Sequence, residues 1–246
     1  MSKSGQKDDI FDTPQEMLVD FVFDEKVAHV FPDMIRRSVP GYDSIIPLLG
    51  IIAEKFVTPG SNIYDLGCSL GASTLSIRRR IQHEGCNIIA VDNADAMVKQ
   101  CRENISSDEH GTTPVDVICD DIRNVKIENA SLAVMNFTLQ FIAPGDRLHL
   151  LKKIASGLNT GGALVLSEKV ISKDTGKQQL IDDLHLAFKR ANGYSDLEIS
   201  QKRTALENVL IPDTMQTHIK RLEKSGFSQI VVWQRCLNFV SFLAIK

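Results

Sequence analysis

The chain has 246 residues, of which 43% are hydrophobic and 24% are charged, and its formal net charge is −3. These values are typical of a soluble globular protein with a sizeable core, and one α/β domain with helical additions accommodates the length. A chain without a basic excess is not expected to bind nucleic acid directly. We therefore expect chemistry on small molecules.

The sequence shows no pattern typical of a membrane-spanning segment or of a metal site. The longest nearly apolar stretch covers residues 45–53, far short of the roughly 20 residues that cross a bilayer. The polar start, Met1–Asp9, lacks a signal-peptide pattern, so a cytoplasmic protein is predicted. The five cysteines form no CxxC pair and have no histidine at metal-ligand spacing, so no metal site is predicted.

Residues 1–56 are expected to form an N-terminal helical cap. Met1–Asp9 is polar and is predicted to be disordered, and helical spacing of apolar residues follows over residues 13–53. Interruptions are expected where proline removes the backbone N–H that a helix interior uses. They are Pro32, Pro40-Gly41 and Pro47.

Residues 57–170 alternate short apolar runs with amphipathic stretches, the pattern of strand–helix units in a doubly wound, mostly parallel sheet. Residues 171–226 are expected to be a helical insertion, broken near Gly193 and Pro212. Residues 227–246 hold two apolar runs without an intervening helix, which predicts an antiparallel hairpin at the sheet edge. The expected strands are Asn62–Leu66, Asn87–Asp92, Val115–Cys119, Leu132–Phe137, Ala163–Glu168, Ser228–Gln234 and Phe239–Ile245.

A loop of small residues follows the first expected strand. The segment Asp65-Leu66-Gly67-Cys68-Ser69-Leu70-Gly71 leads into a helical pattern, and small residues there let the backbone approach a ligand closely. The next expected strand ends in Asp92, whose carboxylate can accept hydrogen bonds from both hydroxyls of a ribose. Together, the loop and Asp92 predict that a cofactor containing a ribose binds at this turn.

The loop allows two other interpretations. Gly67-Cys68-Ser69-Leu70-Gly71 also matches the G-x-S-x-G turn of α/β-hydrolases, with Ser69 as nucleophile and His218 as a later base. The residues before it look helical and contain no oxyanion-loop segment, which disfavours a hydrolase. A nicotinamide cofactor is disfavoured because Ser69 replaces the second glycine of the G-x-G-x-x-G pattern.

Four segments at or near the ends of the expected strands form a wider pattern. They are Asp65-x-Gly67-x-Ser69-x-Gly71, the strand end at Asp92, Asp120-Asp121-Ile122, and Leu158-Asn159-Thr160-Gly161-Gly162. Over about residues 57–169 they resemble class I S-adenosylmethionine-dependent methyltransferases. The resemblance implies a Rossmann-like fold and S-adenosyl-L-methionine as the cofactor. It also implies that residues 67–69 face the methionine part, Asp92 the ribose, and Asp121 with Ile122 the adenine.

Five more segments extend the likeness: Phe31-Pro32-Asp33-Met34-Ile35, Arg37-Ser38-Val39-Pro40-Gly41-Tyr42, Asn136-Phe137-Thr138-Leu139-Gln140-Phe141, Phe188-Lys189-Arg190-Ala191-Asn192-Gly193-Tyr194 and Ser200-Gln201-Lys202-Arg203. With them the chain resembles the carboxy-S-adenosyl-L-methionine synthase family over almost its whole length. That resemblance implies that a carboxylate released from prephenate is placed on the activated methyl carbon of S-adenosyl-L-methionine. It also implies a homodimer, whose product serves a separate tRNA carboxymethyltransferase acting on a wobble uridine.

The site residues are carried over from this resemblance position by position. The resemblance implies a catalytic role for Arg203, whose guanidinium can pair with a carboxylate through parallel hydrogen bonds. Asn136 ends a strand at the edge where doubly wound sheets bind ligands, and Tyr42 can cover a cofactor with its ring. The predicted cofactor-binding residues are Tyr42, Gly67, Cys68, Ser69, Asp92, Asn93, Asp121, Ile122, Asn136 and Arg203.

Two other functions remain open from the sequence. One is an ordinary S-adenosylmethionine-dependent methyltransferase with an unknown acceptor. The other is a cofactor-binding protein without catalysis. Mass spectrometry of the copurifying small molecule would separate the carboxylated cofactor from the common forms.

Overall fold

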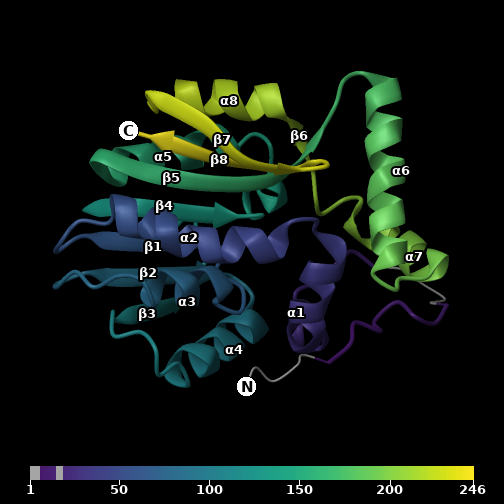
Figure 1. Ribbon diagram of the computed structural model, residues 1–246, viewed down its shortest axis with the longest axis horizontal. Coiled ribbons are helices and arrows are strands. Elements are labelled where there is room, and N and C mark those ends of the chain that lie inside the picture. Colours follow the sequence, from purple (N-terminus) through teal and green to yellow (C-terminus); the bar gives the residue numbers. More distant parts are fainter. Residues whose placement is uncertain (1–5, 15–18) are drawn as a thin grey trace.

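The computed structural model of the protein describes residues 6–14 and 19–246. A twisted sheet runs through the middle of the molecule and helices cover both of its faces (Figure 1). The strands are β1 (Asn62–Leu66), β2 (Asn87–Asp92), β3 (Val115–Cys119), β4 (Ala130–Asn136), β5 (Leu158–Ile171), β6 (Asp213–Thr214), β7 (Gln229–Cys236) and β8 (Phe239–Ile245). The helices are α1 (Glu25–Ser38), α2 (Tyr42–Phe56), α3 (Ala72–Arg78), α4 (Asp95–Ser106), the 3-10 turn η1 (Leu139–Phe141), α5 (Arg147–Gly157), α6 (Thr175–Ala191), α7 (Asp196–Leu206) and α8 (Met215–Lys224).

The strand order β3-β2-β1-β4-β5-β8-β7 is that of a doubly wound sheet. Strands β1 to β5 are parallel, and the chain moves outward from β1 to β3 before it returns to β4 on the other side of β1. This reversal leaves a crevice beyond the carboxyl ends of β1 and β4, where doubly wound sheets bind ligands. The predicted Rossmann-like, mostly parallel fold is confirmed.

The predicted antiparallel edge hairpin is also confirmed. Strand β8 pairs antiparallel with β5, from Ala163 opposite Ile245 to Lys169 opposite Phe239. Strand β7 then pairs antiparallel with β8 and forms the edge of the sheet.

Alternate residues of the central strands supply two separate cores. In β4, Leu132 and Val134 pack in a cluster with residues of α2 and α3. Ala133 and Met135 pack in the opposite cluster with residues of α5 and α8. The side chains of a strand point alternately to its two faces, so one apolar run fills both cores.

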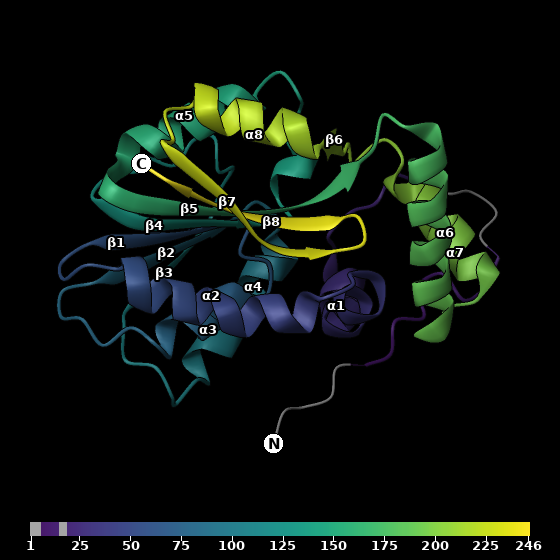
Figure 2. The ribbon, with the colours of Figure 1, turned by 45° about the horizontal axis from the view of Figure 1, so that its top comes forward.

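Helices α1, α6 and α7 lie at the end of the sheet toward which the parallel strands point (Figure 2). Helix α8 packs instead beside α5 over one face of the sheet. Helix α7 begins with a capping box, in which the Ser195 hydroxyl accepts from Glu198 N at 3.2 Å and the Glu198 carboxylate accepts from Ser195 N at 2.6 Å. The breaks expected near Gly193 and Pro212 are confirmed, because α6 ends at Ala191 and α8 begins only at Met215.

Two expected helix interruptions are wrong. Pro32 lies inside α1 and Pro47 lies inside α2, and only Pro40-Gly41 separates the two helices. Each proline removes one backbone donor, but apolar residues on both sides of it pack in the same cluster, Val30 and Met34 around Pro32 being an example. The packing of each continuous apolar face outweighs the lost hydrogen bond.

The N-terminal expectations need correction as well. Residues 1–5 and 15–18 lie outside the described part of the chain. Residues 19–24 are not helical, although helices were expected from residue 13. Asp8 lies in the segment predicted to be disordered, yet it is 2% exposed and makes several polar contacts. Its side chain contacts Tyr194, between α6 and α7, and Lys202 on α7, and no local sequence pattern predicts such distant contacts.

Several strand bounds also differ. Strand β4 begins at Ala130 rather than Leu132, and β5 covers Leu158–Ile171 rather than residues 163–168. The short strand β6 was not predicted, and it pairs parallel with the end of β5. A two-residue strand carries too little periodicity to be recognised in a sequence.

Candidate functional site

The loop between β1 and α3 turns on left-handed backbone angles. Gly67 has φ +87°, Ser69 +49° and Gly71 +83°. A Cβ at Gly67 would overlap the side chain of Thr138, so only glycine fits there. The loop therefore brings its backbone close to the strand ends, where a ligand can contact it.

Asp92 is fixed at the end of β2 by this loop and the next one. Its Oδ2 accepts a hydrogen bond from Ser69 N at 2.9 Å, and its Oδ1 accepts one from Ala94 N at 3.0 Å. Burial raises the pKa of Asp92, and the backbone hydrogen bonds oppose that rise. A carboxylate oxygen has two lone pairs, so both oxygens can still accept from ribose hydroxyls.

Two buried oxygens near the turn lack a hydrogen-bond partner within the described residues. They are Asn136 Oδ1, at the end of β4, and Asp65 Oδ1, at the end of β1. The other oxygen of Asp65 accepts from Thr74 Oγ1 at 2.5 Å, and burial raises the pKa of Asp65 to about 6. An unpaired buried acceptor such as Asn136 Oδ1 fits a ligand that brings donors, and the ammonium and hydroxyl groups of S-adenosyl-L-methionine are donors.

The loop after β3 supplies a carboxylate and an apolar side chain. Asp121 accepts from Arg123 Nη2 at 2.7 Å, and the Arg123 guanidinium holds the pKa of Asp121 below its usual range. Ile122 is buried. A carboxylate that stays ionised can accept from an exocyclic amine, and an aliphatic side chain can pack on a purine ring.

Two predicted site residues keep their protons. A hydrogen bond with Cys101 and burial raise the pKa of the Cys68 thiol. Burial also raises the pKa of Tyr42, whose ring lies 6.5 Å from that of Phe137. Both side chains therefore act as neutral, largely apolar surfaces, with one phenolic O–H available to a ligand.

These groups surround one cavity of about 340 Å³. It lies at the carboxyl ends of the parallel strands and is closed by residues of α1, η1, α6 and α7. The structure brings together every predicted site residue except Arg203. The predicted residues that line the cavity are Tyr42, Gly67, Cys68, Ser69, Asp92, Asn93, Asp121, Ile122 and Asn136.

Arg203 lies on α7 and is exposed, outside the cavity lining. The preceding residue, Lys202, is 6% exposed and lines the cavity. Successive residues of a helix point about 100° apart, so the two cannot both face the same wall. The charge of Arg203 nevertheless reaches the site, because it lowers the pKa of Lys189, which lines the cavity.

Five basic residues of the cavity lining were not predicted: Arg36, Lys169, His185, Lys189 and Lys202. The sequence carried little signal for them, because a lysine on an amphipathic helix is usually a solvated charge. His185 is held by a hydrogen bond between its Nε2 and Ser38 O at 2.8 Å. Burial lowers its pKa to about 4, so the imidazole is neutral near pH 7.

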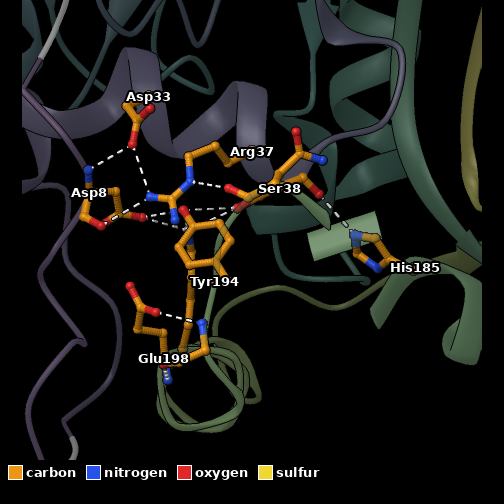
Figure 3. Close-up of polar contacts among 10 residues, drawn as sticks. Asp8, Asp33, Arg37, Ser38, His185, Tyr194 and Glu198 are labelled. Atoms are coloured by element: carbon orange, nitrogen blue, oxygen red, sulfur yellow. Dashed lines mark hydrogen bonds and ion pairs between the residues drawn. The ribbon is translucent and has the colours of Figure 1, made fainter. Parts of the chain in front are cut away.

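A buried cluster of polar side chains connects the N-terminal segment, residues 6–14, to the part of the cavity lining that contains Lys202 (Figure 3). The Asp8 carboxylate accepts from the Tyr194 hydroxyl and lies 3.4 Å from Lys202 Nζ. Arg37 donates to Asp8 O at 3.1 Å, forms an ion pair with Asp33 at 3.0 Å and stacks on the Tyr194 ring. The N-terminal segment, α1 and α7 are therefore held together beside the cavity.

The structure does not bring Ser69 and His218 together as a hydrolase would require. The Ser69 hydroxyl contacts Met97 Sδ at 3.7 Å. His218 lies on α8 against Phe242, outside the cavity lining, and neither ring nitrogen has a partner within the described residues. Ser69 therefore serves the loop, where its backbone N–H holds Asp92.

Comparison with known proteins places this site in a family. Residues 63–162 match the family described as "Methyltransferase domain". The whole chain is similar to proteins named "Carboxy-S-adenosyl-L-methionine synthase". The one from Shewanella pealeana is 58% identical over 99% of this chain and 100% of its own length. The one from Vibrio campbellii is 57% identical over 100% of both chains.

Solved structures show the same fold at low sequence identity. A putative O-methyltransferase from Nostoc punctiforme matches with a TM-score of 0.63 and 14% identity, over 90% of this chain and 60% of that one. Human N-acetylserotonin methyltransferase, in complex with S-adenosylmethionine, matches with a TM-score of 0.59 and 18% identity, over 98% of this chain and 63% of that one. Within the described residues, no helix is long and apolar enough to cross a membrane.

The fold, the cavity and the relatives agree on a transferase that binds S-adenosyl-L-methionine. The identity above half over the full length distinguishes this chain from class I methyltransferases in general. The chain therefore belongs to the carboxy-S-adenosyl-L-methionine synthase family of enzymes, within the class I methyltransferase superfamily.

Proposed function

We propose that the protein converts S-adenosyl-L-methionine and prephenate to carboxy-S-adenosyl-L-methionine and phenylpyruvate. The observation that carries this proposal is the 58% identity, over 99% of the chain, to a protein named for the carboxylated product. Bound S-adenosyl-L-methionine would supply an activated methyl carbon that takes up the carbon dioxide released from prephenate. The methyl proton and the hydroxide that leaves prephenate would combine to water, so the reaction balances. The protein's task is to hold the cofactor and the carboxyl donor in one cavity and to exclude water.

The cavity residues divide this task. Asp92 and the loop at Gly67 are suited to orient the ribose and the methionine part of the cofactor. The unpaired Asn136 Oδ1 is suited to accept from a donor on the cofactor. Arg203 has no ion pair within the described chain, so its guanidinium is available for a carboxylate. Its exposed position allows it to act in its own subunit or in a partner's.

The test is a reaction of the purified protein with S-adenosyl-L-methionine and prephenate, followed by mass spectrometry. We expect carboxy-S-adenosyl-L-methionine and phenylpyruvate to appear together. Formation of S-adenosylhomocysteine with an added acceptor, and no carboxylated product, would favour an ordinary methyltransferase. Binding of the cofactor without turnover of either substrate would favour a non-catalytic binding protein.

The proposal extends to the protein's surroundings. The product would serve a separate tRNA carboxymethyltransferase that modifies a wobble uridine, in the cytoplasm, without this chain binding RNA itself. We also propose a homodimer. Helix α6 exposes Leu180 and Leu184, one helical turn apart, and α7 exposes Leu197. Such a set of apolar side chains is suited to an interface between two copies.

A further inference from the structure

Three lysines from different elements meet in one wall of the cofactor cavity. Lys169 comes from β5, Lys189 from α6 and Lys202 from α7, and all three line the cavity. Helices α6 and α7, which carry two of these lysines, stand beside the strand ends (Figure 2). The ribose carboxylate, Asp92, is part of the same lining, on the loop side formed by β2.

The charges of this wall are not balanced. Lys202 Nζ lies 3.4 Å from the Asp8 carboxylate and donates to Ser38 Oγ at 3.1 Å. Lys169 and Lys189 have no ion pair within residues 6–14 and 19–246. Asp182 acts on Lys169 only at longer range. Two basic side chains therefore face the cavity without a contacting counter-ion among the described residues.

Lys169 and Lys189 are half-buried, and taking a cation partly out of water costs free energy unless an anion compensates it. Burial lowers the pKa of Lys169, and it lowers the pKa of Lys189 to about 7. Lys202 and Arg203 on α7 and Lys169 on β5 add repulsion to Lys189. The neutral His185 of α6 and Arg37 of α1 supply no negative charge. Asp8, the acidic residue that contacts a lysine of this wall in the described part of the chain, is already paired with Lys202.

We propose that Lys169 and Lys189 form a subsite for a small organic dianion with two carboxylates, and that Lys189 determines specificity for it. This inference rests on the proposed function, since prephenate is an anion of this class. Two unpaired cations match two carboxylates. The subsite is part of the cofactor's own cavity, so its occupant is a small molecule beside the cofactor. Lys202, held by Asp8, is a positioning residue behind it.

The test is a calorimetric titration of prephenate into protein saturated with S-adenosylhomocysteine, which has no methyl group to react. In Lys189→Gln we expect prephenate to bind roughly tenfold or more weakly, since the variant loses one charge-assisted contact. The dissociation constant of S-adenosylhomocysteine should stay unchanged. Phenylpyruvate, with one carboxylate, should bind the wild type more weakly than prephenate.

The matched control is Lys177→Gln, an exposed lysine in the first turn of the same helix. It should bind prephenate as the wild type does. Wild-type affinity for prephenate in Lys189→Gln, or equal loss in both variants, would overturn the inference. Folding of each variant is checked by its affinity for S-adenosylhomocysteine, so a misfolded protein is not mistaken for a lost contact.

The pH dependence gives a second measurement. Binding of an anion needs protonated Lys189, whose pKa of about 7 rises when the anion binds. Wild-type affinity should therefore fall as the pH rises from 6.5 to about 8, and the fall should be smaller in Lys189→Gln. The proposed function can fail separately: binding of prephenate at this subsite without formation of carboxylated product would contradict the proposed function and leave the subsite standing. An equal pH dependence in both proteins would contradict the role of Lys189.

Discussion

Asp92 is the residue whose role follows most directly from its local contacts. Its carboxylate is oriented by two backbone N–H groups before any ligand binds. We predict that Asp92→Ala weakens S-adenosyl-L-methionine binding by roughly 1.5–3 kcal/mol, because two ribose hydroxyls lose a charged acceptor. Calorimetry measures the change. Unchanged affinity in a folded variant would remove Asp92 from the site.

A substitution of Arg203 should affect carboxyl transfer and leave cofactor binding nearly unchanged. The neutral S-methyl group of S-adenosyl-L-methionine offers nothing to a guanidinium, whereas a carboxylate does. We predict that Arg203→Ala binds S-adenosyl-L-methionine nearly as tightly as the wild type and loses most synthesis of the carboxylated product from prephenate. Rates are followed by mass spectrometry. Wild-type synthesis by the variant would exclude this role.

Glu168 makes the stability of the protein depend on pH. It is 0% exposed, and burial raises its pKa to about 8 although Leu139 N donates to its Oε1 at 2.8 Å. Between the ordinary pKa of 4.5 and about 8, the folded state binds more protons than the unfolded state. Stability contributed by this group is therefore complete at low pH and is lost as the pH rises, by up to about 1.4 kcal/mol per pH unit.

We predict that Glu168→Gln removes this contribution, because the amide keeps an acceptor for Leu139 N and never ionises. Urea unfolding at pH 5.5, 6.5 and 7.5 gives the free energy of unfolding of both proteins. The difference between variant and wild type should shift in favour of the variant as the pH rises. A constant difference over this range would show that Glu168 does not titrate there.

At the scale of single residues, the sequence predicted the site features that depend only on neighbouring residues in the chain. The loop at Gly67 and the strand end at Asp92 follow from glycine geometry and from an acid at fixed spacing. Lys189 and Lys202 were missed, because each becomes a cavity residue only when α6 and α7 pack across the strand ends. Before that packing is known, they resemble solvated helix charges.

At the scale of elements, α7 depends on a contact with the other end of the chain. Gln201 donates to Phe11 O and Thr13 O at 2.9 Å each, and Lys202 contacts Asp8. The sequence predicted helices in this region from the composition and helical spacing of residues 171–226, with a break near Gly193. It could not predict the N-terminal segment that packs against it, because a short polar stretch has no periodicity.

We predict that Asp8→Asn loosens α7. The Tyr194 hydroxyl and Lys202 would lose a charged acceptor, which costs roughly 1–3 kcal/mol. Hydrogen–deuterium exchange should become faster at the amides of α7 and stay unchanged in the central strand β4. The control is Asp9→Asn, since Asp9 is exposed. Equal exchange in α7 of both variants would contradict a tie through Asp8.

At the scale of the whole molecule, the doubly wound, mostly parallel sheet was accessible from the sequence because strand–helix alternation permits few topologies. Short apolar runs mark β1, β2 and β3, and the absence of a helix after β7 fixes the final hairpin. The position of α6 and α7 over the strand ends was not accessible. It depends on side-chain contacts between segments far apart in the chain, such as Arg37 Nε donating to Asn192 O at 2.7 Å.

The exposed apolar face of α6 is suited to an interface between two copies of the chain. The α6 surface exposes Leu180 and Leu184 at 60% and 45%, and burying such side chains between two copies removes apolar area from water. We predict that the wild type sediments as a dimer at micromolar concentrations and that Leu184→Glu shifts it to a monomer, because a dimer with two-fold symmetry would bury the new charge twice. The control is Val231→Glu, at an exposed position of the edge strand β7. A monomeric wild type would contradict the dimer. A dimer lost in Val231→Glu and kept in Leu184→Glu would place the interface at the sheet edge instead of α6.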